Sequence, residues 1–456
     1  MTSENTHHEF TVVGSGLRGI GLAKALLDRG VRGSDILMLE AAPFFGGSVV
    51  SVPLNGFLVD AGVHMFDAFS DPLYEFVADM DTSLDCVEVQ SSSSYGGVVT
   101  PDFSLPNLTS LTDHEKQSIW SDLKSKPATL DSNSIDELSS LAELFQYRYG
   151  VGASQIFESI FDQIYRLPAS QVEADAILRT SLGRLKFGSD EEMWKLKRST
   201  EFLDDVIAVS KRSLASVQNV SRTYYPSSGE GFNGFVKSCK HFLEGQGVSI
   251  KLKTSLGKIE SQGARLRLFE NSGESIASTA NLMWENDNFG ALELLTRDTN
   301  QLSSLAYGTP MRFVIFGVRL DQVRDFTYHQ NFNSDDLTYR TAYAGQYSGQ
   351  VKNGITFITC ECPVGGFEDL DDGLFLKKVW DEISALNLVE GSPIWGEYRD
   401  IAKTFRMYRT GFRDAFHELC SEVNEVFGDK VSLCDPSLFF KKDIIAASME
   451  SANALA

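Results

Sequence analysis

The sequence predicts an α/β protein with a Rossmann-type nucleotide-binding domain, and three consecutive features support this. Residues 10–13 form a short β-branched and aromatic run, which is the composition of a buried parallel strand. A glycine-rich turn at 14–19 and a segment of helical composition at 20–27 follow directly. A second apolar strand at 35–40 then ends in an acidic residue, which completes a strand–helix–strand unit of about 30 residues.

Length and charge limit what such a chain can do. It has 456 residues, more than one hydrophobic core usually holds, so we expect at least two domains. With 41 Lys and Arg against 62 Asp and Glu, the formal charge is −21, and such a surface repels nucleic acid. The sequence has no secretory signal, no apolar run of roughly 20 residues and no metal-ligand spacing of Cys or His, so a soluble cytoplasmic protein without a metal is predicted.

The glycine-rich turn has the spacing Gly14-x-Gly16-x-x-Gly19, with Leu17 inside it. Glycines at this spacing let the backbone turn tightly and approach a pyrophosphate at the positive end of a helix. Glu40 ends the next strand, where it would accept hydrogen bonds from ribose hydroxyls and disfavour a 2′-phosphate. The alternative is a glycine-rich turn with an incidental acid. The strand before the turn and the helix after it favour dinucleotide binding.

Beyond this unit, short strands, loops and helices alternate. An Asn-Gly turn predicts a hairpin of strands 49–53 and 56–60, and Asp-Pro is a typical start for a helix at 71–80. Residues 81–135 are predicted to be rich in loops, and residues 135–218 to be mostly helical, because apolar residues recur there every three or four positions. Further strands are expected at 248–252, 257–268, 280–284, 310–320, 354–362 and 431–433, and further helices at 232–244, 373–386, 410–427 and 443–455.

The segments after the first unit resemble a known family. A Gly-Gly-Ser run at 46–48 and an Asp-x-Gly-x-His-x-Phe run at 60–66 accompany the glycine-rich turn and Glu40. Together they are similar to the FAD-binding half of the amine oxidase, protoporphyrinogen oxidase and UDP-galactopyranose mutase superfamily. The residues that this resemblance places at FAD are Gly46, Gly47 and Ser48, beside the phosphates and the ribityl chain, and Gly62, Val63 and His64, beside the isoalloxazine ring. A histidine satisfied inside the hairpin core is the alternative for His64.

Two later segments extend the resemblance. A Tyr-Tyr-Pro-x-x-Gly-x-Gly run at 224–231 leads through a helix to Leu256, which the resemblance places against the adenine; plain strand core is the alternative. Strand 431–433 and a helix that opens at Asp443 and Ile444 are similar to the closing segment of the mutases, where an acid and its neighbour approach the flavin. A helix N-terminus suits negative charge on a reduced flavin, although Asp443 could also be a simple N-cap.

One position departs from the family pattern. The family usually has Gly or Gly-Arg directly after the last strand, whereas this chain has Cys434-Asp435. A side chain replaces the open approach that glycine allows, and an acid replaces the cation that would meet the pyrophosphate. We therefore expect altered or weakened FAD binding, unless neighbouring arginines compensate.

A further likeness to the mutases lies around Arg340 and Tyr343. Their run is similar to the Tyr-Thr-Arg segment that the mutases place near the flavin and the substrate diphosphate. Arg340 could clamp a phosphate or carboxylate with two parallel hydrogen bonds, and a surface ion pair is the alternative in so acidic a protein. The aromatic and arginine-rich substrate helix typical of the mutases is not evident.

The resemblance implies a Rossmann-type FAD-binding domain interleaved with an α+β substrate domain. The expected FAD-binding domain consists of residues 9–80, 219–300 and 400–456, and the expected substrate domain of residues 81–218 and 301–399. The implied activity is that of an FAD-dependent oxidoreductase, in which a small organic substrate yields a hydride to flavin N5. His64 and Arg340 are the residues expected at the catalytic centre.

Two other functions stay open at this point. The likeness to the mutases implies a sugar-nucleotide isomerase that uses reduced FAD without net oxidation. The Cys434-Asp435 departure keeps open a flavin-fold protein without turnover that serves as a binding subunit. The expected partner is a small molecule, such as an anion or a sugar nucleotide, and no signature identifies it or the oligomeric state.

Overall fold

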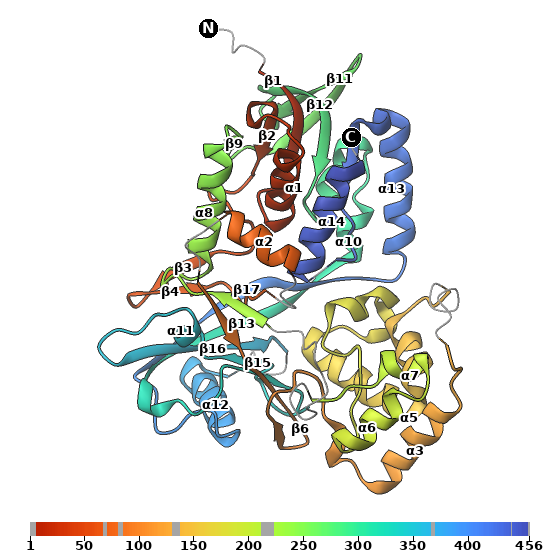
Figure 1. The fold of residues 1–456 in the computed structure, drawn as a ribbon, viewed down its shortest axis with the longest axis vertical. Coiled ribbons are helices and arrows are strands. Elements are labelled where there is room, and N and C mark those ends of the chain that lie inside the picture. The colour runs from red at the N-terminus through yellow and green to blue at the C-terminus, as the bar shows by residue number, and fades with distance from the viewer. Residues whose placement is uncertain are drawn as a thin grey trace. The chain divides into compact units, whose positions relative to one another are not determined.

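The chain divides into two compact units, which each consist of separate stretches of sequence (Figure 1). The computed structural model describes residues 6–66, 71–80, 85–129, 137–210, 223–365, 370–438 and 440–454. Unit 1 consists of residues 1–87, 222–305 and 411–456, and unit 2 of residues 88–221 and 306–410. The chain therefore passes from one unit to the other four times. Which unit binds a cofactor and which binds a substrate stays a prediction.

A seven-stranded sheet forms the centre of unit 1. Its strands are, in spatial order, β10 (Leu256–Gln262), β11 (Arg265–Glu270), β12 (Ser275–Trp284), β1 (His7–Val13), β2 (Ile36–Leu39) and β9 (Ser249–Lys251), with β18 (Val431–Leu433) also paired to β12. Strands β9, β2, β1, β12 and β18 run parallel, so the loops after their carboxyl ends gather at one edge. The stretch expected as strand at 257–268 is divided into β10 and β11 by a turn at Gly263, where φ is +63°.

The predicted strand–helix–strand unit is present, and its helix packs against the last helix of the chain. Helix α1 (Leu17–Asp28) connects β1 to β2, and it lies beside α14 (Lys441–Ala454) in Figure 1. The Ser448 hydroxyl of α14 donates a hydrogen bond to the Arg18 carbonyl oxygen at 3.1 Å, across 430 residues of sequence. The remaining elements of unit 1 are η1 (Gly33–Asp35), β3 (Ser51–Leu54), β4 (Phe57–Asp60), α2 (Asp71–Met80), β8 (Thr223–Pro226), α8 (Phe232–Gly245), α9 (Phe289–Thr296), α10 (Gln301–Leu305), α13 (Phe412–Phe427) and η6 (Gly428–Lys430), and β5 (Cys86–Val89) begins in it.

Unit 2 contains a second seven-stranded sheet. Its strands are, in spatial order, β17 (Trp395–Tyr408), β13 (Ala306–Arg319), β16 (Ile355–Pro363), β15 (Arg340–Ala342), β14 (Tyr328–Asn331), β6 (Ser91–Tyr95) and β7 (Val98–Thr100). All neighbours are antiparallel except β14 and β6, which run parallel. Helix α12 (Asp372–Ala385) buries Phe375, Val379 and Trp380 in a core shared with β13 and β16. Short helices α11 (Ala344–Tyr347) and η5 (Leu320–Gln322) complete this part.

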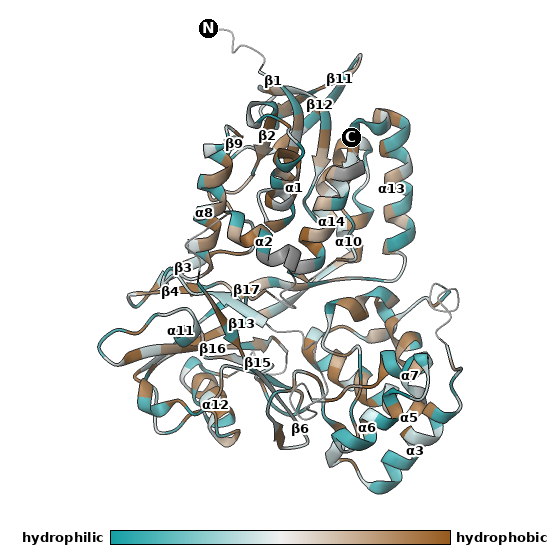
Figure 2. Ribbon diagram, in the orientation of Figure 1, coloured by the Kyte–Doolittle hydropathy of each residue, from teal (hydrophilic) through white to brown (hydrophobic). Residues whose placement is uncertain are grey.

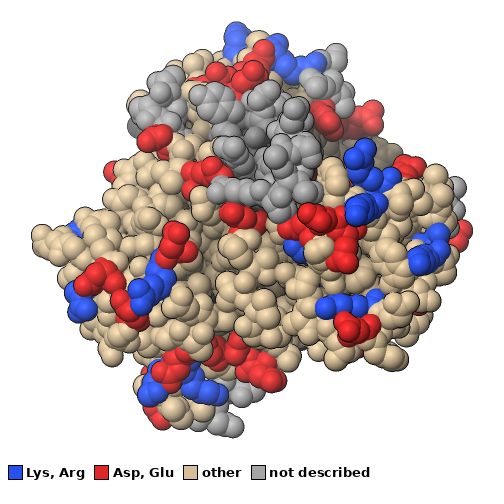
Figure 3. Space-filling view, turned by 60° about the horizontal axis from the view of Figure 1, so that its bottom comes forward, with Lys and Arg blue, Asp and Glu red and all other residues tan. Residues whose placement is uncertain are grey.

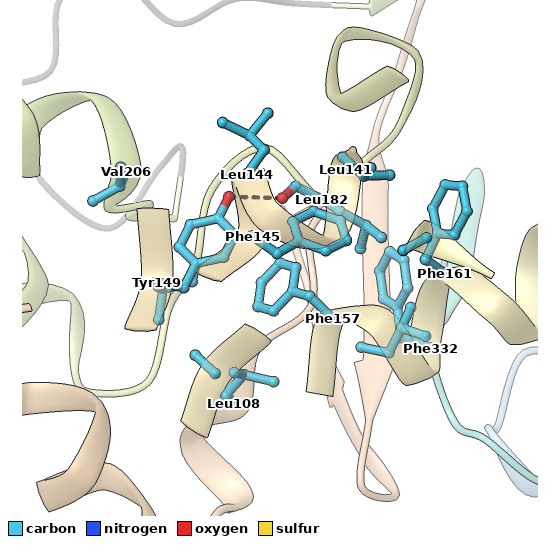
Figure 4. Close-up of a cluster of buried hydrophobic side chains, with 14 of the residues drawn as sticks. Leu108, Leu141, Leu144, Phe145, Tyr149, Phe157, Phe161, Leu182, Val206 and Phe332 are labelled. Carbon is cyan, nitrogen blue, oxygen red and sulfur yellow. Dashed lines mark hydrogen bonds between the residues drawn. The ribbon is translucent and has the colours of Figure 1, made fainter. Parts of the chain in front are cut away.

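The rest of unit 2 is mostly helical, as predicted for residues 135–218, of which 137–210 are described. Its elements are η2 (Leu108–Ser110), α3 (Asp113–Lys124), α5 (Leu141–Tyr165), η3 (Ala169–Gln171), η4 (Ala174–Arg179), α6 (Asp190–Lys197) and α7 (Glu201–Val206). Figure 4 shows their shared core, in which the rings of Tyr149 and Phe157 pack with centroids 4.6 Å apart. The buried Tyr149 hydroxyl donates to the Leu182 carbonyl oxygen at 2.7 Å, so its polar atom is satisfied. The segment 81–135, which was expected to be rich in loops, also contains β6, β7 and α3 within its described residues.

The pattern of polar and apolar residues follows these layers. Helix α13 buries residues three or four positions apart, such as Ala415, Leu419 and Val423, and Figure 2 shows polar and apolar residues alternating along it. On the face drawn in Figure 3, acidic and basic side chains among the coloured residues form small mixed groups, without a continuous basic area. No helix in the described stretches combines the length and the apolar character that crossing a membrane needs.

Candidate functional site

The glycine-rich turn of unit 1 has a geometry that only glycine allows. Gly14 has φ of +109°, and its N–H donates to the Leu39 carbonyl oxygen at 2.9 Å, which ties the turn to β2. A Cβ atom on Gly19 would lie 2.0 Å from the Gly14 carbonyl oxygen. Helix α1 can therefore start directly beside the end of β1 only because neither position carries a side chain.

The N-terminus of α1 carries the features of an anion site. Its N-cap, Gly16, makes no side-chain cap, and the first turn contains no acidic residue. The buried Leu17 anchors the turn, while the half-buried Arg18 adds a positive charge. Backbone N–H groups and the helix dipole therefore present positive potential without a competing side-chain acceptor.

A second glycine pair lies directly against this turn. The Gly46 N–H donates to the Ser15 carbonyl oxygen at 3.1 Å. Gly47 has φ of +62°, and a Cβ atom on it would lie 2.9 Å from the Gly16 Cα atom. The exposed Ser48 follows in the same loop. Two glycine segments that are about 30 residues apart in sequence thus form one surface of bare backbone beside the α1 N-terminus, and the resemblance placed both of them at the pyrophosphate.

Glu40 joins this surface from the end of β2. Its Oε2 atom accepts hydrogen bonds from the Ser15 N–H at 3.0 Å and the Ser15 hydroxyl at 2.7 Å, and its Oε1 atom accepts from the Ala42 N–H at 2.8 Å. The carboxylate therefore braces the glycine-rich turn. Oε1 accepts only one of these bonds, so it keeps a further lone pair for a ligand hydroxyl, as ribose recognition requires.

The hairpin of β3 and β4 is joined to helix α8 through a buried acid. The Asp60 carboxylate accepts hydrogen bonds from the Ser51 hydroxyl at 2.5 Å, the Tyr225 hydroxyl at 2.6 Å and the Phe232 N–H at 3.0 Å. Burial raises its pKa, and these three donors partly offset the effect. Asp60 therefore caps the N-terminus of α8, and the acid of the Asp-x-Gly-x-His run has a structural task.

The residues after Asp60 lead away from this anchor. Gly62 has φ of +140°, and Gly62, Val63 and His64 are all half-buried. The His64 ring meets the Phe232 ring edge-on, with centroids 6.1 Å apart. The segment is thus positioned by the Asp60 anchor and the Phe232 contact, and a role beside a flavin stays a prediction.

Three further predicted residues lie at other ends of elements of unit 1. Leu256 begins β10 and pairs with Glu270. The Thr254 N–H, two residues earlier, donates to the Glu40 carbonyl oxygen at 2.9 Å. Asp443 and Ile444 lie in the first turn of α14, where the N–H groups of both donate to the Phe440 carbonyl oxygen at 3.0 Å.

Sequence reasoning missed Arg18 and Glu285, which lie at the edge where the parallel strands end. Arg18 donates to the Leu438 carbonyl oxygen at 2.7 Å, and its charge acts on both Glu285 and Cys434. It therefore places a cation at this edge, where the expected Gly-Arg is absent. Burial raises the pKa of the Cys434 thiol to about 12, so it is neutral at pH 7. Glu285 follows β12 and is buried beside the turn.

Arg340 lies in unit 2, at the start of β15. Its guanidinium carbon is 4.8 Å from the centroid of the Tyr339 ring and 4.5 Å from that of the Phe405 ring. A guanidinium nitrogen lies 3.5 Å from Glu361, and only 14% of the Arg340 side chain is exposed. The ion pair considered as its alternative is present, but it is buried and not at the surface, and a role at a substrate stays a prediction. Tyr343, nearby in sequence, is buried and stacks on Phe326.

The Arg340 guanidinium stays protonated in this setting. The surrounding tyrosines and Glu361 raise the pKa of its guanidinium, although burial opposes them. Its Nε atom is buried and has no hydrogen-bond partner among the described residues. The guanidinium therefore contacts two aromatic rings and one carboxylate.

Comparisons with known proteins identify similar domains and similar folds. Residues 12–80 match the family model of NAD(P)-binding Rossmann-like domains. A structure of reduced UDP-galactopyranose mutase is similar with a TM-score of 0.72 and 14% identity, over 98% of this chain and 93% of the other. A candidate protoporphyrinogen oxidase from Exiguobacterium sp. 255-15 gives 0.67 and 16%, over 100% and 99%. The chain has the amine oxidase-like fold. No curated protein sequence matches it.

Another structure supports this amine oxidase-like fold over the whole chain. Cyclohexylamine oxidase from Brevibacterium oxydans IH-35A is similar with a TM-score of 0.63 and 13% identity, and 99% of each chain is covered. The predicted fold class and the resemblance in fold are thus confirmed. At identities this low, the likeness establishes the fold, and the chemistry has to be argued from the residues of this chain.

Proposed function

We propose that the protein is an FAD-dependent oxidoreductase, in which oxidation of a small organic substrate delivers a hydride to flavin N5. The observation that carries the proposal is the bare backbone surface formed by the two glycine segments at the α1 N-terminus. It suits the pyrophosphate of a dinucleotide, because side chains at Gly19 or Gly47 would collide with backbone atoms. The amine oxidase-like fold, which extends over the whole chain, favours FAD as the dinucleotide.

Several residues of unit 1 would hold the cofactor. The backbone N–H groups of the α1 N-terminus and the Arg18 guanidinium would meet the pyrophosphate, and Glu40 would accept hydrogen bonds from the adenosine ribose. His64 and the first turn of α14, at Asp443 and Ile444, would lie beside the flavin ring. The N-terminal end of α14 would then stabilise negative charge that develops on the reduced ring.

Arg340 would bind an anionic or strongly polar group of the substrate. The rings of Tyr339 and Phe405 fix the plane of its guanidinium. The side chain therefore loses little conformational freedom when a ligand binds. Glu361 holds the group in place while water is excluded from it. We place the reaction in the cytoplasm, because all six cysteines are free thiols, as a reducing compartment keeps them.

A sugar-nucleotide isomerase is the second candidate, since the similar mutase structure and a buried, stacked Arg340 both suit a substrate diphosphate. The two candidates differ in electron balance. If substrate bleaches the oxidised flavin, the mutase is ruled out. If anaerobically reduced protein converts a UDP-sugar without net electron transfer, the oxidoreductase is ruled out.

The first experiment tests whether FAD binds at all. Purified protein should be yellow, with flavin absorption bands, or should become so on reconstitution with FAD. Gly19→Ala should lose the flavin, because its Cβ would lie 2.0 Å from the Gly14 carbonyl oxygen. Gly245→Ala, at the end of α8 with no atom within 4 Å of its added Cβ, is the matched control and should stay yellow.

A colourless protein that takes up no FAD would remove both enzymes and favour a non-catalytic binding subunit. Once a substrate is known, Arg340→Gln should raise the KM for an anionic substrate about tenfold or more, because a charged hydrogen bond contributes roughly 1.5–3 kcal/mol. An unchanged KM would end that role for Arg340.

A further inference from the structure

A buried acid lies directly beside the candidate pyrophosphate site. The Glu285 N–H donates to the Val13 carbonyl oxygen at 3.0 Å, which continues the pairing of β12 with β1 by one residue. A Cβ atom on Gly14 would lie 3.2 Å from the Glu285 carbonyl oxygen. The backbone of Glu285 therefore runs along the glycine-rich turn, on the side of the neighbouring strand.

The side chain of Glu285 is buried without a hydrogen-bond donor. Only 7% of the residue is exposed, and no described residue donates a hydrogen bond to its carboxyl group. Burial raises its pKa from 4.5 to about 7, and the Arg18 charge only partly offsets this. A buried acid without donors is costly as an anion, so a large fraction of Glu285 is neutral near pH 7.

One cation and two exposed acids accompany Glu285 and Cys434 at this edge. Arg18 of α1 is the cation that acts on it. The neighbouring Cys434 thiol is neutral, and it is influenced by the negative charges of Glu285, Asp287 and Asp435. Asp287 and Asp435 are exposed and lie in the loops after β12 and β18. A pyrophosphate that enters here would therefore meet one cation and several acids.

We propose that Glu285 binds the pyrophosphate of the dinucleotide as a neutral carboxylic acid, so that cofactor binding takes up one proton from solvent. The protonated carboxyl group donates its O–H to a phosphate oxygen, and no covalent bond forms or breaks. The proposal rests on the proposed function, because it assumes that FAD occupies the turn. It assigns to Glu285 the donor that the family pattern would provide from another position.

The sign of the pH dependence follows from linkage. Below pH 7 the carboxyl group is already protonated, so FAD affinity should not depend on pH through this group. Above pH 7 each binding event must first protonate Glu285, and the affinity should fall by up to tenfold per pH unit. A charged carboxylate would instead repel the pyrophosphate at short range, in surroundings where little water screens it.

The test is a titration of FAD-free protein with FAD between pH 5.5 and 8.5, followed by flavin fluorescence. Calorimetry at pH 8, in two buffers of different ionisation enthalpy, measures the protons taken up. The proposal predicts an uptake approaching one proton per FAD and a Kd that rises above pH 7. Glu285→Gln keeps a hydrogen-bond donor but cannot titrate, so its Kd should be flat. Asp287→Asn is the matched control and should keep the slope.

Each outcome decides the matter. Tight FAD binding with no proton uptake and a flat Kd in the wild-type protein would overturn the role of Glu285 and leave the proposed function standing. A slope that persists in Glu285→Gln would assign the proton to another group and also overturn it. Failure to bind FAD at any pH would overturn the proposed function and this role together. The proton count of the wild-type protein decides even if the variant does not fold.

Discussion

Glu285 in unit 1 and His329 in unit 2 are both buried and both tend to the neutral form, yet their surroundings differ. Burial raises the pKa of Glu285 to about 7 and lowers the pKa of His329 to about 4. The His329 ring is hydrogen-bonded on both nitrogens, to the Ser92 hydroxyl at 2.8 Å and to the Ser94 hydroxyl at 3.0 Å. Glu285 accepts no hydrogen bond from the described residues.

This difference distinguishes a buried group that supports the fold from a buried group that can bind a ligand. His329 lies inside a satisfied network between β6 and β14, where a neutral ring helps to define one strand pairing. Glu285 lies at the edge where parallel strands end, which is the usual ligand edge of such sheets. No described residue donates a hydrogen bond to its carboxyl group, so a ligand that binds at this edge can be its partner.

The largest expected effect concerns a third buried titratable group, Asp60, whose hydrogen bonds are satisfied like those of His329. Asp60→Ala removes the acceptor of the Ser51 and Tyr225 hydroxyls and of the Phe232 N–H. Breaking a buried network of this kind should cost about 3–5 kcal/mol. Chemical denaturation followed by tryptophan fluorescence measures it. A loss below about 1 kcal/mol would contradict the structural role of Asp60.

Replacing Glu285 should instead raise the free energy of unfolding. A carboxyl group that titrates at 4.5 in the unfolded chain and near 7 in the folded one destabilises the native state as pH rises from 4.5 to 7, by about 3 kcal/mol in total. Glu285→Gln should therefore be more stable than the wild type by about that amount at pH 8, and similar to it near pH 4. Denaturation at both pH values checks this, and equal differences at the two would refute it.

For His329 the stability of the native state should fall as pH decreases, whereas for Glu285 it falls as pH increases. The unfolded histidine takes up a proton as pH falls below 6.5, whereas the folded one does so only near 4. The native state therefore loses up to about 3 kcal/mol between pH 6.5 and 4 through this group. His329→Gln should remove that loss while keeping groups that can hydrogen-bond to Ser92 and Ser94. The difference between the two stability curves is the measurement, and parallel curves would speak against a buried neutral ring.

The smallest expected effect comes from removing one hydrogen-bond partner of His329, so that this site resembles that of Glu285. Ser92→Ala removes the partner of His329 Nδ1 while Ser94 still pairs with Nε2. An unsatisfied buried polar atom should cost about 1–3 kcal/mol. Thermal unfolding would detect the change, and Ser125→Ala, at an exposed hydroxyl after α3, is the control that should stay near the wild type. A change no larger than that of the control would mean that water replaces Ser92.

The nucleotide-binding turn could be predicted because its signal is local. Gly14, Gly16 and Gly19 stand between a recognisable strand and helix, and each spacing has a steric reason. The hairpin before Asp60 was predicted for a similar reason, since its Asn-Gly turn requires positive φ at Asn55 and Gly56. Local geometry of this kind depends on few residues, so the sequence is sufficient.

Other elements were missed because tertiary contacts decide them. Strand β6 contains four consecutive serines, which have no strong strand preference, and it is held by its pairing with β14. Strand β17 is half-exposed and lacks a regular alternation of apolar residues. Helix α3 did carry a local signal, the capping box of Thr112 and Glu115, which was overlooked because only a short apolar stripe follows.

Glu285 could not be recognised as a site residue from sequence. An acid after a strand says nothing about burial. Its place beside Gly14 depends on the pairing of β1 with β12, which joins segments about 270 residues apart. Arg340 illustrates the same limit, since its stacking on Phe405 requires a residue that lies 65 positions later in another strand.

The packing of α14 against α1 has a consequence for how the protein is made. Residues 88–410 contain all of unit 2, and they are synthesised before β18 and α14. At about 5–20 residues per second, the 430 residues between Arg18 and Ser448 take roughly 20 to 90 seconds to synthesise. During that time a nascent chain can fold unit 2, while unit 1 still lacks α14, the helix that packs against α1.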